Sequence, residues 1–548
     1  MKQKKFMKEL LKEIYRNNKS IFYFTLFVAI FSWVANIWWP VIQKYVVDSI
    51  VDFESFERIV YLIIIFFFAY AFTQLFWALT YYFSKKIWES VLSYYRHKSI
   101  EKFNRVKFNI ILDKKEWEIN EVISKWTKAL SETINNFFGS ILQNGFIIFF
   151  GLVVLFAVNI YIFLYFTFIF IPLFVFYSLK EIKRIIPASK KLNQKENKVS
   201  GSIIEYLSNI RDIKLLWAEN NFTRSFFRSF GSLFDTGMNI EKKHHFMNFK
   251  QFLILTWSIC LILLYTSYNI VLWILSVGTF LLVYSIFLHI RYALWAMVFL
   301  YRNFEENIIK INKLLDFFEL EETENIKPQK IKSFQSLEIK KLEFDFGEDQ
   351  KVLKSINFSI QSGKKIAIIW KSWAGKTTLI NIILWLYEWY KWKILLNSED
   401  ISGNIDNLFS YVPQDVQVFN ENLKFNLTLW GKFKDADLID MLKKVWLSYL
   451  SKRAQKWKTI LDIMVGSDGL KLSGWERQRL WIARAMIRDK DIYVFDEITS
   501  NLDEQTEKDI IDLIFSIAKN KTFIIISHKK EILKKVDRVY EMKNGKLI

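Results

Sequence analysis

"IIWKSWAGKTTLI", residues Ile368 to Ile380, decides how this chain is interpreted. The stretch begins as a buried strand and ends as a helix, and Gly375, Lys376 and Thr377 between them match the end of the pattern G-x-x-x-x-G-K-[ST]. In such a loop the backbone N–H groups and the helix N-terminus hold phosphates, the lysine reaches the β and γ phosphates, and the threonine binds Mg²⁺. The stretch therefore predicts a nucleotide site.

The sequence around this loop alternates strands and helices, as in an α/β domain with a largely parallel sheet. "KKIAIIW" precedes the loop, "DIYVFDE" ends in Asp496 and Glu497, and "KTFIIISH" ends in His528. Ligands of such sheets bind beyond the carboxyl ends of the strands. We expect these side chains to gather near the phosphate loop.

The first 300 residues are different, because they contain six apolar runs with almost no charge. Each run is long enough to cross a hydrocarbon core of about 30 Å as a helix, with its backbone hydrogen bonds satisfied internally. The sequence predicts an all-α, six-helix membrane domain whose spans are residues 21–43, 59–83, 137–158, 161–179, 252–272 and 274–300.

Lysine and arginine are dense in the N-terminal arm and in two long loops, residues 84–136 and 180–250. By the positive-inside bias, both termini and both loops face the cytoplasm. The arm lacks a cleavage site after a short apolar core, so we do not expect a removed signal peptide. Both loops have helical periodicity, which predicts long helical hairpins whose tips lie near residues 113–120 and 209–220.

The net charge of +20 invites a nucleic-acid interpretation, but membrane topology explains it more simply, and we expect no nucleic-acid partner. The single cysteine, Cys260, lies within the fifth apolar run, so no disulfide within the chain is expected.

Further motifs follow in a fixed order. "YVPQD" contains Gln414, "LSGWERQRLWIARAM" spans Leu472 to Met486, and "SNLD" ends at Asp503. With the phosphate loop, "IYVFDE" and "IIISHK", the chain resembles an ABC transporter, specifically an exporter-type half-transporter, over nearly its whole length. The resemblance implies four parts: a cytoplasmic arm (1–20), a type 1 transmembrane domain (21–310), a linker (311–335) and an ATP-binding domain (336–548).

The resemblance also implies ATP and Mg²⁺ as cofactors and assigns roles to single residues. Glu497 polarises the attacking water, His528 and Gln414 contact the γ-phosphate, and Asp496 holds the metal. Metal ligands are therefore expected at Thr377, Gln414 and Asp496. ATP contacts are expected at Phe346, Trp370, Ser372, Trp373, Ala374, Gly375, Lys376, Thr377, Thr378, Ser473, Gly474, Trp475, Glu476 and Asp503. Ser473 and Gly474 would serve the nucleotide of a second subunit.

Tryptophan stands at several of these positions where the resembled family has glycine, namely Trp370, Trp373 and Trp475. A phosphate loop needs glycine for positive φ angles and for close approach of its amides. The chain has 16 glycines and 21 tryptophans, and 16 + 21 = 37 is close to the roughly 38 glycines of average composition. We hypothesise that most of these tryptophans are glycine in the natural protein, through a UGA codon read as tryptophan. Other family glycine positions hold Trp117, Trp217, Trp273, Trp385, Trp392 and Trp481. With tryptophan at these positions, we expect the nucleotide pocket to be partly filled by the indole rings of Trp370, Trp373 and Trp475.

The expected function is ATP-driven export by a dimer of half-transporters in a bacterial plasma membrane, as a multi-pass protein. The cargo is open: a lipid, a peptide, a drug or another hydrophobic compound. The alternative is a catalytically degenerate, nucleotide-binding partner subunit of a heterodimeric transporter. ATPase activity of glycine-corrected protein separates the two.

Overall fold

The computed structural model of the chain describes residues 19–112, 116–323, 333–345, 352–370, 375–384, 386–387, 391–400, 408–453, 459–466, 471–498, 504–517 and 520–548. The chain divides into two compact units. The first comprises Met1–Val106 and Lys114–Glu321, and the second comprises Lys107–Asp113 and Glu322–Ile548. A short piece of the first predicted loop therefore belongs to the second unit.

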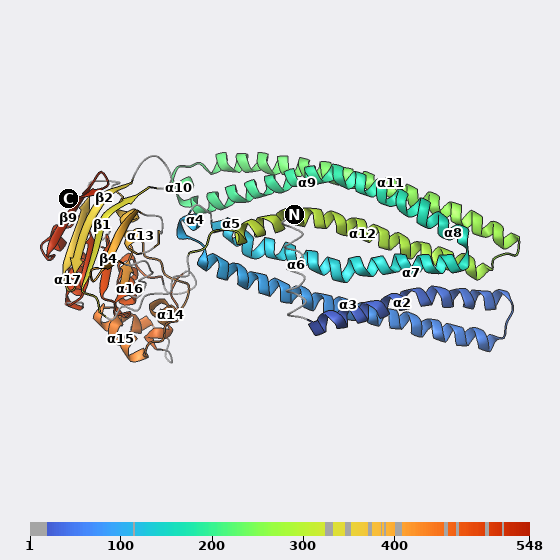
Figure 1. The fold of residues 1–548 in the computed structure, drawn as a ribbon, viewed down its shortest axis with the longest axis horizontal. Coiled ribbons are helices and arrows are strands. Elements are labelled where there is room, and N and C mark those ends of the chain that lie inside the picture. Colours follow the sequence, from blue (N-terminus) through green and yellow to red (C-terminus); the bar gives the residue numbers. More distant parts are fainter. Residues whose placement is uncertain are drawn as a thin grey trace. The chain divides into compact units, whose positions relative to one another are not determined.

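The first unit is built from long helices (Figure 1). They are α2 (Lys19–Val51), α3 (Phe56–Arg105), α5 (Glu116–Glu121), η1 (Val122–Trp126), α6 (Thr127–Asn136), η2 (Phe137–Ile141), α7 (Leu142–Val158), α8 (Ile160–Tyr165), η3 (Phe166–Phe170), α9 (Ile171–Ser208), α10 (Ile210–Leu215), α11 (Glu219–Val271) and α12 (Val277–Phe318). Helix α2 lies beside α3, α9 beside α11, and α12 beside α7.

Five helical stretches of the described chain are long and apolar enough to cross a membrane. They are residues 56–105, 118–158, 160–208, 219–271 and 277–318. The first of the six predicted spans is helical, as α2, but it is not among these five. At about 1.5 Å per residue, α11 alone is about 80 Å long, so it extends far beyond the hydrocarbon core.

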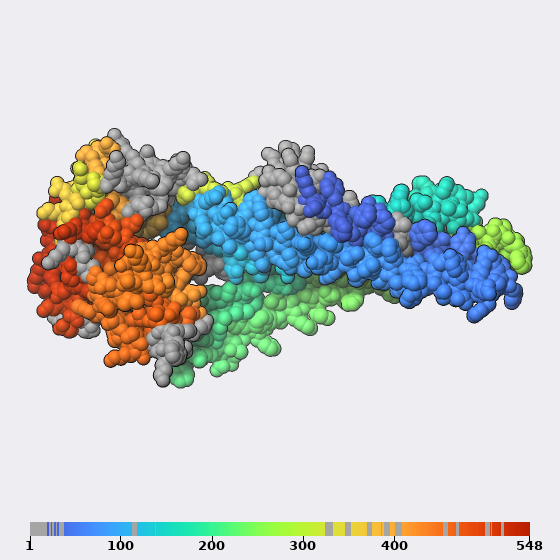
Figure 2. Space-filling view, turned by 90° about the horizontal axis from the view of Figure 1, so that it is seen from below, coloured from blue at the N-terminus to red at the C-terminus, as the bar shows by residue number. Residues whose placement is uncertain are grey.

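The interior of the first unit is aromatic. Phe166, Phe170 and Phe174 follow one another at four-residue spacing across η3 and α9, so they share one helix face. All three are fully buried, and the rings of Phe166 and Phe170 lie 6.0 and 5.6 Å from that of Phe287 on α12. By contrast, Phe67 on α3 is mostly exposed, as expected of a helix that faces lipid. Figure 2 shows α3 in blue along one side of this unit.

At the predicted tip, residues 209–220, α9 ends at Ser208 and α11 begins at Glu219, with only α10 between them. Its role as a tip that contacts the second unit stays a prediction. The other predicted tip, 113–120, includes residues 113–115, which lie outside the described residues. The short helix α4 (Phe108–Leu112) precedes it within the second unit, where the ring of Phe108 lies 6.3 Å from that of Tyr387. Helix α12 continues to Phe318, into the predicted linker.

The second unit is an α/β domain with two sheets. Its strands are β1 (Ser336–Phe344), β2 (Leu353–Gln361), β3 (Lys365–Trp370), β4 (Lys391–Leu396), β5 (Glu399–Asp400), β6 (Phe409–Val412), β7 (Ile492–Asp496), β8 (Thr522–Ile526), β9 (Arg538–Lys543) and β10 (Lys546–Leu547). One sheet has the order β2-β1-β4-β5 and the other β10-β9-β3-β8-β7-β6. In the larger sheet, β3, β6, β7, β8 and β9 pair in parallel, which confirms the predicted class of sheet.

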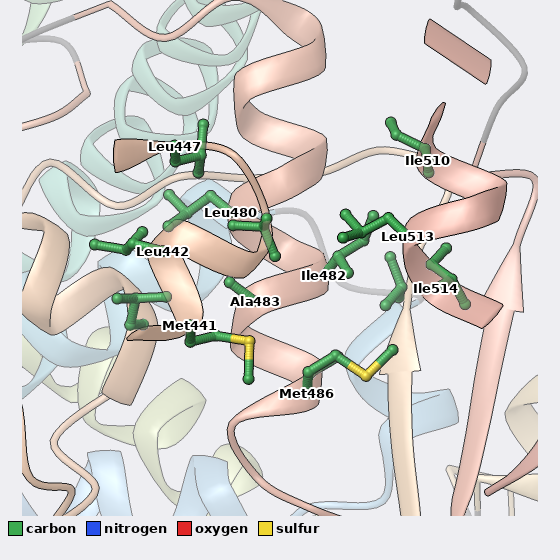
Figure 3. Packing of buried hydrophobic residues seen from close by; sticks show 14 of the residues in the cluster. Met441, Leu442, Leu447, Leu480, Ile482, Ala483, Met486, Ile510, Leu513 and Ile514 are labelled. Atoms are coloured by element: carbon green, nitrogen blue, oxygen red, sulfur yellow. The ribbon is translucent and has the colours of Figure 1, made fainter. Parts of the chain in front are cut away.

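The helices of the second unit pack against the larger sheet and against one another. They are α13 (Lys376–Ile383), α14 (Leu423–Thr428), α15 (Asp435–Lys444), η4 (Ser448–Arg453), η5 (Ile460–Asp462), α16 (Gly474–Met486), α17 (Glu504–Ile517) and α18 (Lys530–Leu533). Figure 3 shows Leu480 and Ala483 of α16 facing Leu442 of α15, while Ile482 of the same helix lies toward Leu513 of α17. Apolar contacts on both sides therefore fix α16.

Candidate functional site

The three strands singled out in the sequence are neighbours in the larger sheet, in the order β3-β8-β7. Because they are parallel, their carboxyl ends lie at one edge. The residues that follow them are the Gly375–Thr378 segment after β3, His528 after β8 and Glu497 after β7. Gln414 follows β6, the next strand along. Parallel pairing thus places these residues at one edge of the sheet, and their roles toward nucleotide stay predictions.

Gly375 begins helix α13 in a left-handed conformation, with φ at 82°. A Cβ atom there would lie 2.9 Å from Leu353 Cδ2, so the position needs glycine for both backbone and space. The chain therefore turns sharply into α13, and Lys376 and Thr377 occupy its first turn. Helix N-termini attract anions through their unpaired N–H groups and dipole.

Glu497 is the centre of a charged cluster at this edge. One carboxylate oxygen forms an ion pair with the Lys376 ammonium group, and the other accepts a hydrogen bond of 2.9 Å from the Gln414 amide. The Lys376 and Glu497 side chains are only 21% and 18% exposed, so solvent screens the pair weakly. The cluster joins residues from three segments that lie up to 121 positions apart.

Glu497 has a φ angle of 48°, which is rare for a residue with a long side chain. Its backbone N–H group donates to the Ile526 carbonyl at 3.0 Å, so β8 holds the strained turn in place. Residues kept in such conformations concentrate at functional sites. The strained turn directs the carboxylate toward Lys376.

Asp496 is buried, and its Oδ1 atom has no hydrogen-bond partner in the described structure. Its Oδ2 atom accepts a hydrogen bond of 3.4 Å from the Tyr411 hydroxyl. Burial raises the pKa of the Asp496 carboxyl, and the nearby Lys376 ammonium group opposes that rise. A buried carboxylate oxygen without a partner fits a residue that binds a cation. Among the described residues, no group of three or more His, Cys, Asp or Glu side chains could hold a metal ion by itself.

Ser473 begins helix α16 with a reciprocal cap. Its backbone N–H donates to Glu476 Oε2 at 2.6 Å, and its hydroxyl accepts from the Glu476 N–H at 3.3 Å. The Tyr449 hydroxyl donates to the other oxygen of this buried carboxylate. Glu476 thus stabilises the start of α16. Gly474 is exposed, and a Cβ there would meet nothing within 4 Å, so this helix end is open to an approaching molecule.

Trp475 follows directly, and its ring contacts its own domain. It lies 5.9 Å from the Tyr449 ring and 5.1 Å from the Arg479 guanidinium. The side chain of Trp370 and the whole of Trp373 lie outside the described residues, so the expected filling of the pocket by their indoles stays a prediction.

Several other predicted ATP contacts also stay predictions. Phe346, Ser372, Ala374 and Asp503 lie outside the described residues. Thr377 and His528 are exposed, and Thr378 is buried. Their roles toward nucleotide stay predictions.

Sequence reasoning missed Tyr411 and Tyr449. Tyr411 alternates with buried neighbours along β6, which is a weak signal, and only the parallel pairing with β7 brings it to Asp496. Tyr449 is brought to Glu476 by the packing of η4, which has no periodic signature.

These features define a class: a helical membrane unit fused to an α/β unit with a phosphate-binding loop. The description "ABC transporter transmembrane region" matches residues 22–294, and "ABC transporter" matches residues 353–500. The chain belongs to the ABC transporter family, as an exporter-type half-transporter that spans the membrane several times.

The chain is also similar in sequence to proteins described as flippases and transporters. The chain is 26% identical over 387 residues to an ATP-dependent lipid A-core flippase of Wigglesworthia glossinidia brevipalpis, which covers 68% of this chain and 65% of the relative. It is 33% identical over 205 residues to the flippase of Idiomarina loihiensis, with 37% and 35% covered. It is 26% identical over 394 residues to a mitochondrial iron-sulfur clusters transporter of Kluyveromyces lactis, with 69% and 54% covered. The chain thus matches less than two thirds of each relative's length.

The fold has a close counterpart among solved structures. A bacterial Atm1-family ABC exporter with ATP bound superposes with a TM-score of 0.82 at 20% identity, covering 97% of this chain and 94% of the other. At this identity the likeness establishes the fold.

Proposed function

We propose that this chain is an ATP-driven exporter that works as a dimer of half-transporters. The observation that carries the proposal is the cluster of Lys376, Gln414 and Glu497 beside Asp496, at the carboxyl edge of a parallel sheet, in a chain that also contains membrane helices. The relatives described as an ATP-dependent flippase and an iron-sulfur clusters transporter support it.

The side chains divide the work of hydrolysis. Lys376, freed from Glu497 when nucleotide binds, neutralises the β and γ phosphates. Glu497 then accepts a hydrogen bond from the attacking water and orients it, while Gln414 holds the carboxylate in place. His528, at the end of β8, donates a hydrogen bond to the γ-phosphate. These groups stabilise charge in the transition state, which is the main source of catalysis in phosphoryl transfer.

The metal site is proposed at Asp496 and Thr377, with Gln414 completing it. A bound Mg²⁺ ion would supply positive charge that neutralises the charge developing on the phosphates. The unpartnered Oδ1 atom of Asp496 is available to hold the ion or one of its waters. Tyr411 keeps Oδ2 occupied and so fixes the orientation of the carboxylate.

The second subunit is proposed to place its Ser473 and Gly474 against this nucleotide. The start of α16 is exposed at Gly474, and its dipole favours phosphate. Closure of two such units on two ATP molecules would move the membrane helices through the tips near residues 113–120 and 209–220. The proposed location is a bacterial plasma membrane with both termini in the cytoplasm, and the proposed cargo is a hydrophobic compound.

A catalytically degenerate partner subunit is the second candidate. It is favoured by one observation, the tryptophan at position 475 beside the proposed phosphate contact. Purified protein with glycine at 370, 373 and 475, reconstituted in lipid, separates the two. Phosphate release that Glu497→Gln abolishes supports the exporter, whereas nucleotide binding without turnover supports the degenerate subunit.

A further inference from the structure

Four tryptophans of the described chain have left-handed backbone conformations. The φ angles are 53° at Trp217, 59° at Trp273, 63° at Trp430 and 57° at Trp446. Here the Cβ atom of an L-residue crowds the backbone, so bulky residues rarely adopt this conformation, whereas glycine does so freely. Tryptophan supplies 21 of 548 residues but four of the thirteen described non-glycine residues with positive φ. Tryptophan is therefore strongly over-represented among these left-handed positions.

Three of these four tryptophans, Trp217, Trp273 and Trp446, lie directly after the end of a helix, at a position where glycine is the usual residue. After α15, the Trp446 N–H donates to the Lys443 carbonyl at 2.9 Å, and the Leu447 N–H donates to the Leu442 carbonyl at 2.8 Å. These two bonds form a Schellman motif, in which the residue after the cap is left-handed. The same pairs follow α10 and α11: Trp217 to Lys214 (3.2 Å), Ala218 to Ile213 (3.0 Å), Trp273 to Ile270 (2.9 Å) and Ile274 to Asn269 (2.9 Å).

The side chains offer little compensation for the backbone conformation. Trp217, Trp273 and Trp430 are 87%, 95% and 84% exposed, and Trp430 makes one edge-to-face ring contact, with Phe425 at 4.7 Å. Trp446 is half-exposed and lies over the Arg479 guanidinium at 4.7 Å. Tryptophan contributes to stability mainly when its large ring is buried. Backbone and environment at these positions both fit glycine better than tryptophan.

We propose that Trp217, Trp273, Trp430 and Trp446 are glycine in the natural protein, because its gene uses UGA as a glycine codon. A reassigned codon exchanges one residue type for one other, which matches the shortage of glycine and the excess of tryptophan. Two of these positions, 430 and 446, are identified only by their backbone conformation. The proposal rests on local geometry and does not depend on the transport function.

Glycine in place of tryptophan would also change the phosphate loop. Gly375 is left-handed and sterically confined, and Trp373 lies two residues before it in the sequence. Glycine at 370, 373 and 475 would leave the phosphate cradle bare. The nucleotide site would then be complete rather than degenerate.

The gene and the native protein test the proposal directly. We expect UGA at all four codons. Native membranes digested with trypsin should give three peptides that cover residues 215–224, 425–432 and 445–452, each with the mass of glycine in place of tryptophan. UGG at any of the four codons, or a tryptophan mass in any of these peptides, would overturn the proposal. Neither readout involves ATP, so its failure is distinct from failure of the proposed function.

Thermal unfolding of the expressed chain tests the conformational argument separately, on one helix. Trp273→Gly replaces an exposed left-handed residue after α11 and should raise the unfolding temperature by a few degrees. Trp257→Gly is the matched control, because Trp257 is 70% exposed within regular α11, where glycine should lower the unfolding temperature. The argument fails if Trp273→Gly also lowers the unfolding temperature.

Discussion

The Lys376 ammonium group forms an ion pair with the Glu497 carboxylate at the carboxyl edge of the larger sheet. In the proposed mechanism the same lysine binds the phosphates of ATP. We therefore expect nucleotide to compete with Glu497 for Lys376.

Glu497→Gln should separate binding from hydrolysis. Loss of the carboxylate should lower phosphate release by about 10²- to 10⁴-fold, the usual contribution of a general base. It should also tighten ATP binding by about 3- to 10-fold, on the order of 1 kcal/mol, because the competing partner of Lys376 is neutralised. Nucleotide titration and phosphate release on glycine-restored protein measure both effects.

Glu531→Gln is the control for that experiment, since Glu531 is an exposed carboxylate paired with Lys534. It should leave both quantities unchanged. Undiminished turnover in Glu497→Gln would remove Glu497 from the mechanism.

Lys376→Met should weaken ATP binding by about 10- to 100-fold, because a hydrogen bond to a charged group contributes roughly 1.5–3 kcal/mol. Lys364→Met is the control, since Lys364 forms an exposed ion pair with Asp537 in the same domain. Equal ATP affinity in the two variants would contradict the assignment of Lys376 to phosphate.

Much of this site was accessible from sequence because it follows the ends of strands. Asp496 ends one apolar strand, His528 lies two residues after another, and Lys376 begins the helix that follows a third; parallel pairing of β3, β8 and β7 brings these strand ends together. The four-residue spacing of Phe166 and Phe170 also indicates that both side chains lie on one face of a helix.

Contacts between distant segments were not accessible. The cap at Ser473 can be read from the spacing to Glu476, but the Tyr449 hydroxyl reaches that carboxylate only through tertiary packing. The left-handed backbone at Trp430 and Trp446 could not be predicted for another reason. Tryptophan rarely adopts positive φ angles, so the residue type at these positions gives no sign of the conformation.

Asp496→Asn should stabilise the nucleotide-free second unit at neutral pH while weakening Mg²⁺-dependent ATP binding. Folding raises the pKa of Asp496 above its ordinary value of 3.8 through burial. The ionised carboxylate therefore destabilises the fold as pH rises from that value through the folded pKa. The stability advantage of Asp496→Asn should shrink as pH falls toward 4, as measured by denaturant unfolding. An advantage that does not vary with pH would contradict this account.

Asn426→Ala should destabilise the second unit by about 2–4 kcal/mol, because it leaves several buried partners unsatisfied. The fully buried side chain accepts from the Phe419 N–H at 2.9 Å and donates to the carbonyls of Phe419 and Glu421 at 3.0 and 3.2 Å. Asn426→Asp keeps the acceptor and loses the donors, so it separates the two contributions. A change in unfolding free energy below about 0.5 kcal/mol for Asn426→Ala would show that these bonds are not needed.

Mixed dimers test whether Ser473 serves the nucleotide of the partner. A dimer of one Lys376→Met subunit and one Ser473→Arg subunit should keep one intact composite site and trap one ATP. A dimer that carries both changes in one subunit should trap none. The reverse result, with one ATP trapped only when both changes are in one subunit, would place Ser473 at the nucleotide of its own subunit.

The most direct test of the whole account is ATP hydrolysis in lipid by the chain with glycine at positions 370, 373 and 475, compared with the chain as written. The account predicts sustained hydrolysis by the first, none by the second, and loss of hydrolysis when Glu497→Gln is added to the first. Equal hydrolysis by the chain as written, or no hydrolysis by the glycine-restored chain, would contradict it.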